Sequence, residues 1–150
     1  MKGTTDENLL DSAISLAENF GWRLIPVNGK KPIIRDWPNN ASNDPAQLKK
    51  WWRAHPSANM GVATGAGSGV DVLDVDGEKG KRSLLELQEK YGQLPETVLR
   101  ETGGGGLHYF FSHHGEDFKN STGKIAPGLD FKTNGGQVVL PPSTHPITGR

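Results

Sequence analysis

The stretch that decides the fold reads Val70-Asp71-Val72-Leu73-Asp74-Val75-Asp76-Gly77. Its valines and leucine favour a β-strand, and the glycine-rich segment 65–69 leads into it. Side chains alternate between the faces of a strand, so Asp74 and Asp76 are expected to point the same way, about 7 Å apart. Carboxylates at this spacing suit a pair of divalent cations about 4 Å apart. The alternative is an ordinary turn at Asp76-Gly77, with Asp74 solvated at a sheet edge.

Composition narrows the class of protein. The 150 residues carry 17 basic and 17 acidic side chains, so the formal net charge is zero and gives no indication of nucleic-acid binding. No cysteine is present, which excludes disulfides and thiolate zinc sites, and no zinc is expected. The chain has no apolar run of membrane length and does not begin like a signal peptide. We therefore expect a cytoplasmic protein without a membrane partner, with a length that suits a single domain.

Basic side chains gather between residues 30 and 53, and tryptophans lie among them. Cations and flat rings together suit phosphates and stacked bases. The tryptophans of a short helix more commonly pack into the core, so the cations carry more of this interpretation. They are Lys30, Lys31, Arg35, Lys49, Lys50 and Arg53.

Periodicity and turn residues predict mixed α and β structure, with helices beside a largely antiparallel sheet. Helices are expected from the capping box Thr4–Glu7 to residue 20, from Pro45 to before Pro56, and over 83–91. Residues 113–127 are polar and are expected to form an irregular loop. Strands are expected over 22–27, 61–64, 70–76, 97–102 and 107–112, with a last pair, 129–133 and 137–140, around the Asn134-Gly135-Gly136 turn.

A second candidate motif runs from Thr102 through four glycines to Leu107 and His108. Glycines let a backbone approach a ligand closely, and their N–H groups suit phosphate oxygens. A histidine there could donate a hydrogen bond to phosphate near neutral pH. The alternative is a hairpin whose histidine is satisfied at the start of a strand.

A third candidate is the apolar strand that carries Asp130 and Lys132 on one face, followed by Pro141-Pro142-Ser143. A further carboxylate could complete a two-metal site, and a nearby lysine could steady a triphosphate. Ser143, on an extended loop, could also reach a ligand. The alternative is a surface salt-bridge pair on an exposed sheet face.

In this order, the three motifs resemble the bifunctional primase-polymerase domain of the archaeo-eukaryotic primase superfamily. Upstream, Gly29-Lys30-Lys31-Pro32, the Trp51-Trp52 helix and the stretch 59–65 are similar to the N-terminal half of that family, so the resemblance covers nearly the whole chain. It implies an α+β, primase-like fold, in which an N-terminal α/β lobe packs on an RRM-like antiparallel lobe and the active-site cleft lies between them. The whole of residues 1–150 would be this catalytic domain, expected to be a C-terminally truncated fragment of a longer protein.

The resemblance also implies roles for individual residues. Asp74, Asp76 and Asp130 would be catalytic and hold two Mg²⁺ or Mn²⁺ ions, and His108 would contact the triphosphate of the incoming nucleotide. The family motif has serine at Thr102 and sometimes basic residues where this chain has glycines, so phosphate binding is expected to be weaker or to use backbone amides. The further nucleotide contacts expected are Thr102, Lys132, Lys31 and Ser143.

The implied function is that of a DNA primase and DNA polymerase domain in a plasmid, phage or prophage type replication protein. It would transfer (d)NTPs onto a primer or initiating nucleotide on a single-stranded or primed DNA template, and a helicase domain could follow in the full-length chain. One alternative is a rolling-circle-type replication endonuclease with Tyr91 as nucleophile. Another is a non-catalytic module that binds nucleotide or template.

Overall fold

The computed structural model describes residues 5–95, 97–102, 105–113 and 121–140, and the side chains of 9–95, 97–102, 105–113 and 125–140. The helices in these ranges are α1 (Thr5–Phe20), α2 (Trp37–Asn40), α3 (Pro45–Ala54) and α4 (Gly77–Tyr91). The strands are β1 (Leu24–Asn28), β2 (Lys31–Pro32), β3 (Asn59–Ala63), β4 (Val70–Val75), β5 (Val98–Glu101), β6 (Leu107–Ser112), β7 (Ser121–Ala126), β8 (Leu129–Lys132) and β9 (Gln137–Leu140).

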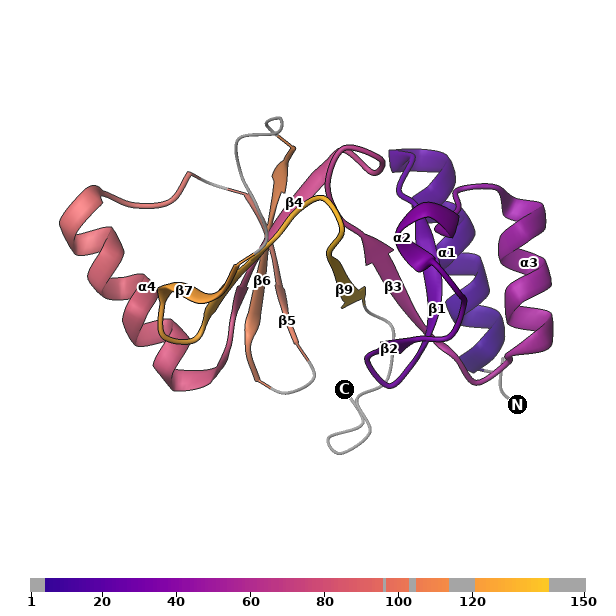
Figure 1. Ribbon diagram of the computed structural model, residues 1–150, viewed down its shortest axis with the longest axis horizontal. Coiled ribbons are helices and arrows are strands. Elements are labelled where there is room, and N and C mark those ends of the chain that lie inside the picture. The colour runs from indigo at the N-terminus through magenta and orange to yellow at the C-terminus, as the bar shows by residue number, and fades with distance from the viewer. Residues whose placement is uncertain (1–4, 96, 103–104, 114–120, 141–150) are drawn as a thin grey trace.

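Within the described ranges the strands form two antiparallel sheets, in the orders β2-β1-β3-β9 and β5-β6-β4-β8-β7. Helices α1, α2 and α3 accompany the first sheet. Helix α4 lies at the far side of the second sheet, so that this sheet stands between α4 and the first sheet (Figure 1). The α+β class expected from the sequence is confirmed.

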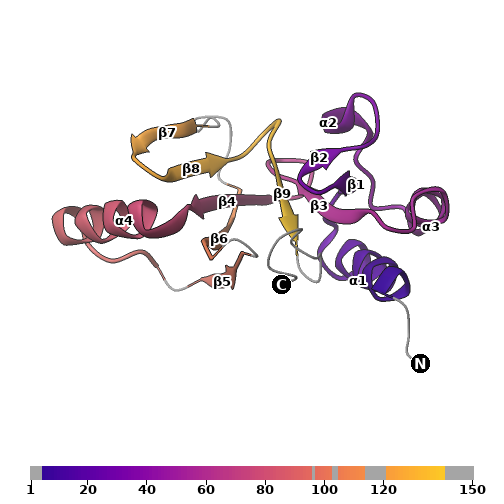
Figure 2. The same cartoon turned by 90° about the horizontal axis from the view of Figure 1, so that it is seen from below.

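Alternation along the strands sorts the apolar side chains into layers. One face of the first sheet, with Leu24, Met60 and Val62, packs against Leu48 and Trp52 of α3 and against the buried residues of α1. The opposite face, with Ile25 and Val27, lies under Trp37 of α2. Figure 2 shows α1 and α3 on one side of this sheet and α2 on the other.

The second sheet is also covered on two faces. Leu73, Val75 and Leu129 pack against Leu84 of α4. On the opposite face, the side chains of Val70, Val72 and Phe110 belong to the apolar cluster of the first sheet. The face of β4 that carries Val70 and Val72 is therefore the face where the two sheets meet.

Several predicted elements are confirmed, including α1, α3 and β4 to β6. Helix α3 begins as expected, since the Asp44 carboxylate accepts a hydrogen bond from the Ala46 N–H (3.1 Å). Trp52 is buried at 3% exposure and donates its indole N–H to the Ala58 carbonyl (3.1 Å). Its ring is a core residue, and so it does not offer a face to a base.

Three expectations about elements were wrong. Helix α4 begins at Gly77 rather than at residue 83, because Asp76 takes the N-cap position in extended conformation (φ −96°, ψ 108°). Part of the predicted loop 113–127 is strand β7, which the polar sequence of residues 121–124 did not indicate. The predicted last strand pair does not form, since β8 joins β4 in the second sheet and β9 joins β3 in the first.

The strands β8 and β9 separate because residues 133–136 cross between the sheets instead of turning back. The Thr64 hydroxyl donates to the Thr133 carbonyl (2.6 Å), and the Asn134 side-chain oxygen accepts from the Ala66 N–H (2.8 Å). The crossing between β3 and β4 is thereby hydrogen-bonded to the crossing between β8 and β9. In the part of the chain that the structure describes, no helix has the length and apolar character needed to span a membrane.

Candidate active site

Asp74 lies on the central strand of the second sheet and has a polar residue opposite it on each neighbouring strand. The register pairs Asp74 with His108 of β6 and with Asp130 of β8. Residues directly opposite in an antiparallel ladder project from the same face, with Cβ atoms about 5 Å apart. The fold thus brings three residues that are distant in sequence into one row, and we call His108, Asp74 and Asp130 the polar row.

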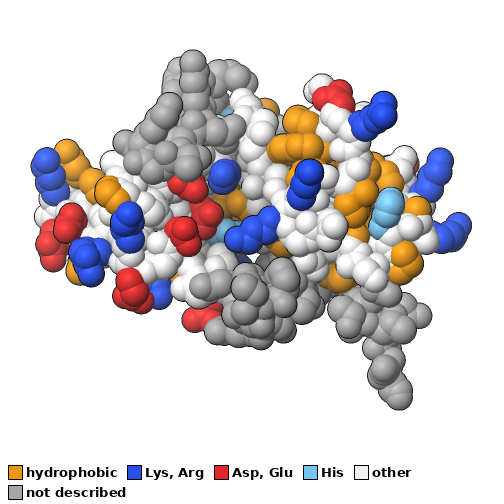
Figure 3. Space-filling view, turned by 60° about the horizontal axis from the view of Figure 1, so that its bottom comes forward, with side chains coloured by type: hydrophobic (Ala, Val, Ile, Leu, Met, Phe, Trp, Pro, Cys, Tyr) orange, Lys and Arg blue, Asp and Glu red, His pale blue; other side chains and the backbone are white. Residues whose placement is uncertain are grey.

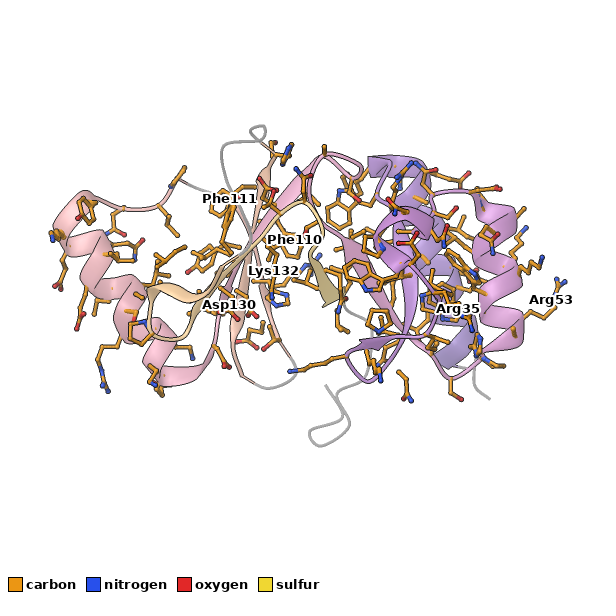
Figure 4. All side chains as sticks on the ribbon, in the orientation of Figure 1. Arg35, Arg53, Phe110, Phe111, Asp130 and Lys132 are labelled. Atoms are coloured by element: carbon orange, nitrogen blue, oxygen red, sulfur yellow. The ribbon has the colours of Figure 1, made fainter. Side chains whose placement is uncertain are left out.

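The polar row stands on the face that meets the first sheet, because Asp74 alternates in phase with Val72 and Val70. Figure 4 shows Lys132 and Phe110 on the side of the second sheet toward β9, with Asp130 further along β8. On the face shown in Figure 3, acidic side chains and a histidine gather near the middle of the molecule, with basic side chains next to them.

His108 and Asp74 contact each other directly. The His108 Nε2 atom lies 3.3 Å from the Asp74 carboxylate, and the two side chains are 10% and 27% exposed. The Phe110 ring meets the imidazole edge-on, with centroids 6.2 Å apart. When protonated, His108 offsets part of the negative charge that Asp74 and Asp130 bring together on this face.

Asp76 continues the same face one step beyond the end of β4. Its extended backbone donates an N–H to the Gly128 carbonyl (2.8 Å), so the pairing with the β8 side persists, and its carboxylate makes no cap hydrogen bond to α4. Continuing the register sets Gly106 and Gly128 on either side of Asp76. A Cβ atom on Gly106 would lie 2.5 Å from the Val75 carbonyl oxygen, so this flank has no room for a side chain. The glycines leave the Asp76 carboxylate exposed.

Thr102 closes the hairpin that precedes His108. Its hydroxyl oxygen accepts from the Gly106 N–H (2.8 Å), and its backbone N–H donates to the Gly106 carbonyl (2.9 Å). The Thr102 hydroxyl therefore stabilises the turn, a role that the sequence did not predict. Gly103 and Gly104 lie outside the described residues, so the expected glycine cradle is not fully described.

The other predicted contacts are spread over the molecule. Lys132 lies two residues after Asp130 on the same face, opposite Val72. Lys31 is exposed on β2 in the first sheet, and Ser143 lies outside the described residues. In the predicted basic cluster, Arg35 and Arg53 lie with the first sheet and α3, away from Asp130 (Figure 4).

The donor set of this face suits a hard divalent cation. Asp74 and Asp130 are paired neighbours and Asp76 follows on the same face, and carboxylate oxygens are preferred ligands of Mg²⁺ and Mn²⁺. Within the ranges that the structure describes, no three His, Asp or Glu side chains are already grouped closely enough to hold a metal ion. Binding would therefore need rotation of these side chains.

A second polar cluster lies at the other end of β4 and was missed by the sequence reading. His113 Nδ1 lies 3.0 Å from the carboxylate of Asp71 and 3.3 Å from the hydroxyl oxygen of Thr133. The Asp71 and His113 side chains are 3% and 10% exposed, and Thr133 is fully buried. The available signal was the acid at position 71 in an otherwise apolar strand, out of phase with Asp74, because a buried carboxylate requires a partner.

The fold and this face together define an α+β domain with acids and a histidine assembled on adjacent antiparallel strands. A comparison with protein-family models matches residues 13–150 to the Prim-Pol family, described as bifunctional DNA primase/polymerase, N-terminal. The chain belongs to this family, which confirms the resemblance read from the three motifs. Membership implies DNA and nucleotides as substrates and nucleotidyl transfer as the general activity.

Proposed function

We propose that this domain elongates or initiates nucleic-acid strands on a DNA template by metal-dependent nucleotidyl transfer, as part of a plasmid, phage or prophage type replication protein. The observation that carries the proposal is the register of the polar row, which assembles two carboxylates and an imidazole on one face. Membership in the Prim-Pol family supports it independently. We also propose that the two sheets correspond to the two lobes of a primase-like architecture, with the active site between them.

In this proposal Asp74, Asp76 and Asp130 would hold two Mg²⁺ or Mn²⁺ ions. When bound, such ions lower the charge cost of bringing a 3′-hydroxyl to the α-phosphate and of releasing pyrophosphate. The backbones of Asp74 and Asp130 are paired on a β-ladder, so only side-chain rotation would be needed to bring their carboxylates to an ion. Asp76 is the most adaptable of the three, since it lies at a strand end with glycines on both flanks.

His108 and Lys132 would orient the incoming nucleotide. Both project from the face of the polar row, and each can donate hydrogen bonds to phosphate oxygens. His108 contacts Asp74 in the described structure, so we propose that it turns to the triphosphate once the Asp74 carboxylate is engaged elsewhere. Lys31, Thr102 and Ser143 are proposed as more distant contacts to nucleotide phosphates.

The test is primer extension on a primed DNA template with Mn²⁺ or Mg²⁺ and each nucleotide class. Asp74→Asn and Asp130→Asn keep side-chain size and are expected to abolish extension while circular dichroism and the melting temperature show an intact fold. Asp11→Asn, at an exposed position of α1, is the matched control and should extend primers like the wild type. Extension by Asp74→Asn at the wild-type rate would refute the proposal. Nucleotide and template binding by a wild type that does not extend any primer would instead indicate a non-catalytic module.

A further inference from the structure

A chain of aromatic contacts connects the polar row with the surface of the first half of the chain. The His108 imidazole meets the edge of Phe110, the Phe110 ring stacks on Trp22 (centroids 5.8 Å apart, planes 15° apart), and Trp22 contacts Phe20 (5.4 Å). Phe110 is buried at 6% exposure, whereas Phe20 is 63% exposed. This chain of aromatic contacts therefore ends at the surface in the Phe20 ring, which packs on Trp22.

The backbone at Phe20 is held by the end of α1, and the ring itself contacts Trp22. Phe20 is the last residue of α1, and the helix closes there because the Gly21 N–H donates to the Ala17 carbonyl (3.0 Å) and Gly21 adopts positive φ (69°). Since Trp22 stacks on a residue of β6, the ring is held in relation to the second sheet as well as to its own helix. An exposed ring that already packs against another ring loses less conformational freedom when a flat ligand stacks on it than a free side chain would.

A cation follows Trp22 directly in the sequence, at the residue before β1. Arg23 is exposed, and its backbone is fixed at both ends, because its N–H donates to the Ser68 hydroxyl (2.9 Å) and its carbonyl accepts from the Ala63 N–H (2.9 Å). Its side chain extends over Gly67, since a Cβ atom on that glycine would lie 3.3 Å from the guanidinium nitrogen Nη1. The guanidinium thus lies beside the exposed Gly67, at the end of β1 that follows Trp22.

We propose that Phe20 and Arg23 form a contact for the single-stranded template outside the active site. An unpaired base would stack on the outer face of Phe20, and Arg23 would bind a neighbouring phosphate, the combination that single-strand binding uses. The choice of single-stranded DNA as the ligand rests on the proposed function. The binding surface is inferred from the aromatic contacts of Phe20 and from the position of Arg23. The rings of Trp22 and Phe110 connect Phe20 with His108, so a template base on Phe20 would lie near the polar row.

Fluorescence anisotropy with a labelled oligothymidylate, in EDTA and without nucleotide, tests the stacking contact. Phe20→Ala is expected to weaken binding by roughly tenfold, the effect typical of losing one stacked base, and Phe20→Trp should restore it. Leu85→Ala is the control, since Leu85 is also an exposed apolar residue (54%) but lies on α4, beyond the second sheet (Figure 1). It should bind like the wild type.

Two further measurements separate stacking from a merely structural role. An abasic strand of equal length should bind the wild type and Phe20→Ala equally, because no base is present to stack. Arg23→Gln should lower the slope of log affinity against log salt by about 0.7, the change expected for one phosphate contact on a single strand, while Phe20→Ala leaves that slope unchanged.

The contact is overturned if Phe20→Ala binds oligothymidylate like the wild type, if it loses equal affinity for the abasic strand, or if the wild type does not bind single-stranded DNA. Since the assay contains neither metal nor nucleotide, a failure of primer extension does not affect it. Conversely, a negative result in this binding assay does not bear on the chemistry of the polar row. The two proposals can therefore be refuted independently.

Discussion

Gly80 of α4 and Gly128 of the turn between β7 and β8 approach so closely that neither position has room for a Cβ atom. A Cβ on Gly80 would lie 2.5 Å from the Gly128 carbonyl oxygen, and a Cβ on Gly128 would lie 2.5 Å from the Gly80 nitrogen. The Asp76 carbonyl accepts from the Gly80 N–H (3.0 Å), and the Gly128 carbonyl accepts from the Asp76 N–H (2.8 Å). This contact therefore sets the distance between the start of α4, where Asp76 lies, and the strand that carries Asp130.

Gly80→Ala should destabilise the domain although alanine is the better helix former by about 1 kcal/mol. The new methyl group meets backbone atoms, which cannot turn aside, and such overpacking costs about 1–3 kcal/mol. We expect a lower midpoint in urea denaturation and slower primer extension. Lys79→Ala, at the exposed neighbouring position, should stay within about 0.5 kcal/mol of the wild type. Equal or greater stability of Gly80→Ala would show that the two glycines are not in tight contact.

The same glycine contact shows where sequence reading reaches its limit. Apolar alternation and cap residues sufficed for α3 and β4, because those signals are local. The GEKGK stretch at the start of α4 holds two glycines, which lower its helix propensity, and the approach of Gly80 to Gly128 accounts for a glycine at position 80 in a way that the sequence alone does not display. For the same reason the helix was predicted to begin too late.

The sequence also did not indicate which strands pair with each other. The strands β8 and β9 have the composition and spacing of a hairpin, yet Asn134 binds the Ala66 N–H and the chain crosses to the other sheet. The convergence of Asp74 with Asp130 was expected from the resemblance to a family, whereas periodicity alone could place Asp130 only on a strand face. The His113 partner of Asp71 required the register of β4 with β6, which no local pattern encodes.

Metal binding should stabilise the domain through the paired acids. Saturating Mn²⁺ at about a hundred times its dissociation constant adds about 2.7 kcal/mol, which corresponds to a rise in melting temperature of roughly 5–10 °C for a domain of this size. We expect this rise in a thermal shift assay of the wild type and its loss in Asp130→Asn. Asp11→Asn should keep the full rise. A rise that persists in Asp130→Asn would place the ion elsewhere.

His108→Gln should act mainly on nucleotide affinity. Glutamine keeps a donor near the Asp74 carboxylate but has no charged form, so a charge-assisted hydrogen bond to phosphate is lost. We expect the KM for nucleotide in steady-state primer extension to rise by roughly tenfold or more, with a smaller change in kcat. His55→Gln, at the exposed C-cap of α3, is the control and should leave both constants unchanged. A change confined to kcat would assign His108 to the reacting atoms rather than to the triphosphate.

The buried pair of Asp71 and His113 should hold the start of β4 to the end of β6 and to the crossing that follows β8. Removing one member leaves the other without its partner, so Asp71→Ala should lower the free energy of unfolding by about 3 kcal/mol or more. Together with His113→Ala it should cost clearly less than the sum of the single changes, with a coupling of at least about 1 kcal/mol in a double-mutant cycle. The exposed pair of Glu78 and Lys81, 3.7 Å apart, is the control and should show a coupling below about 0.5 kcal/mol. Additive losses for Asp71 and His113 would mean that their contact does not help to hold the start of β4 to the end of β6.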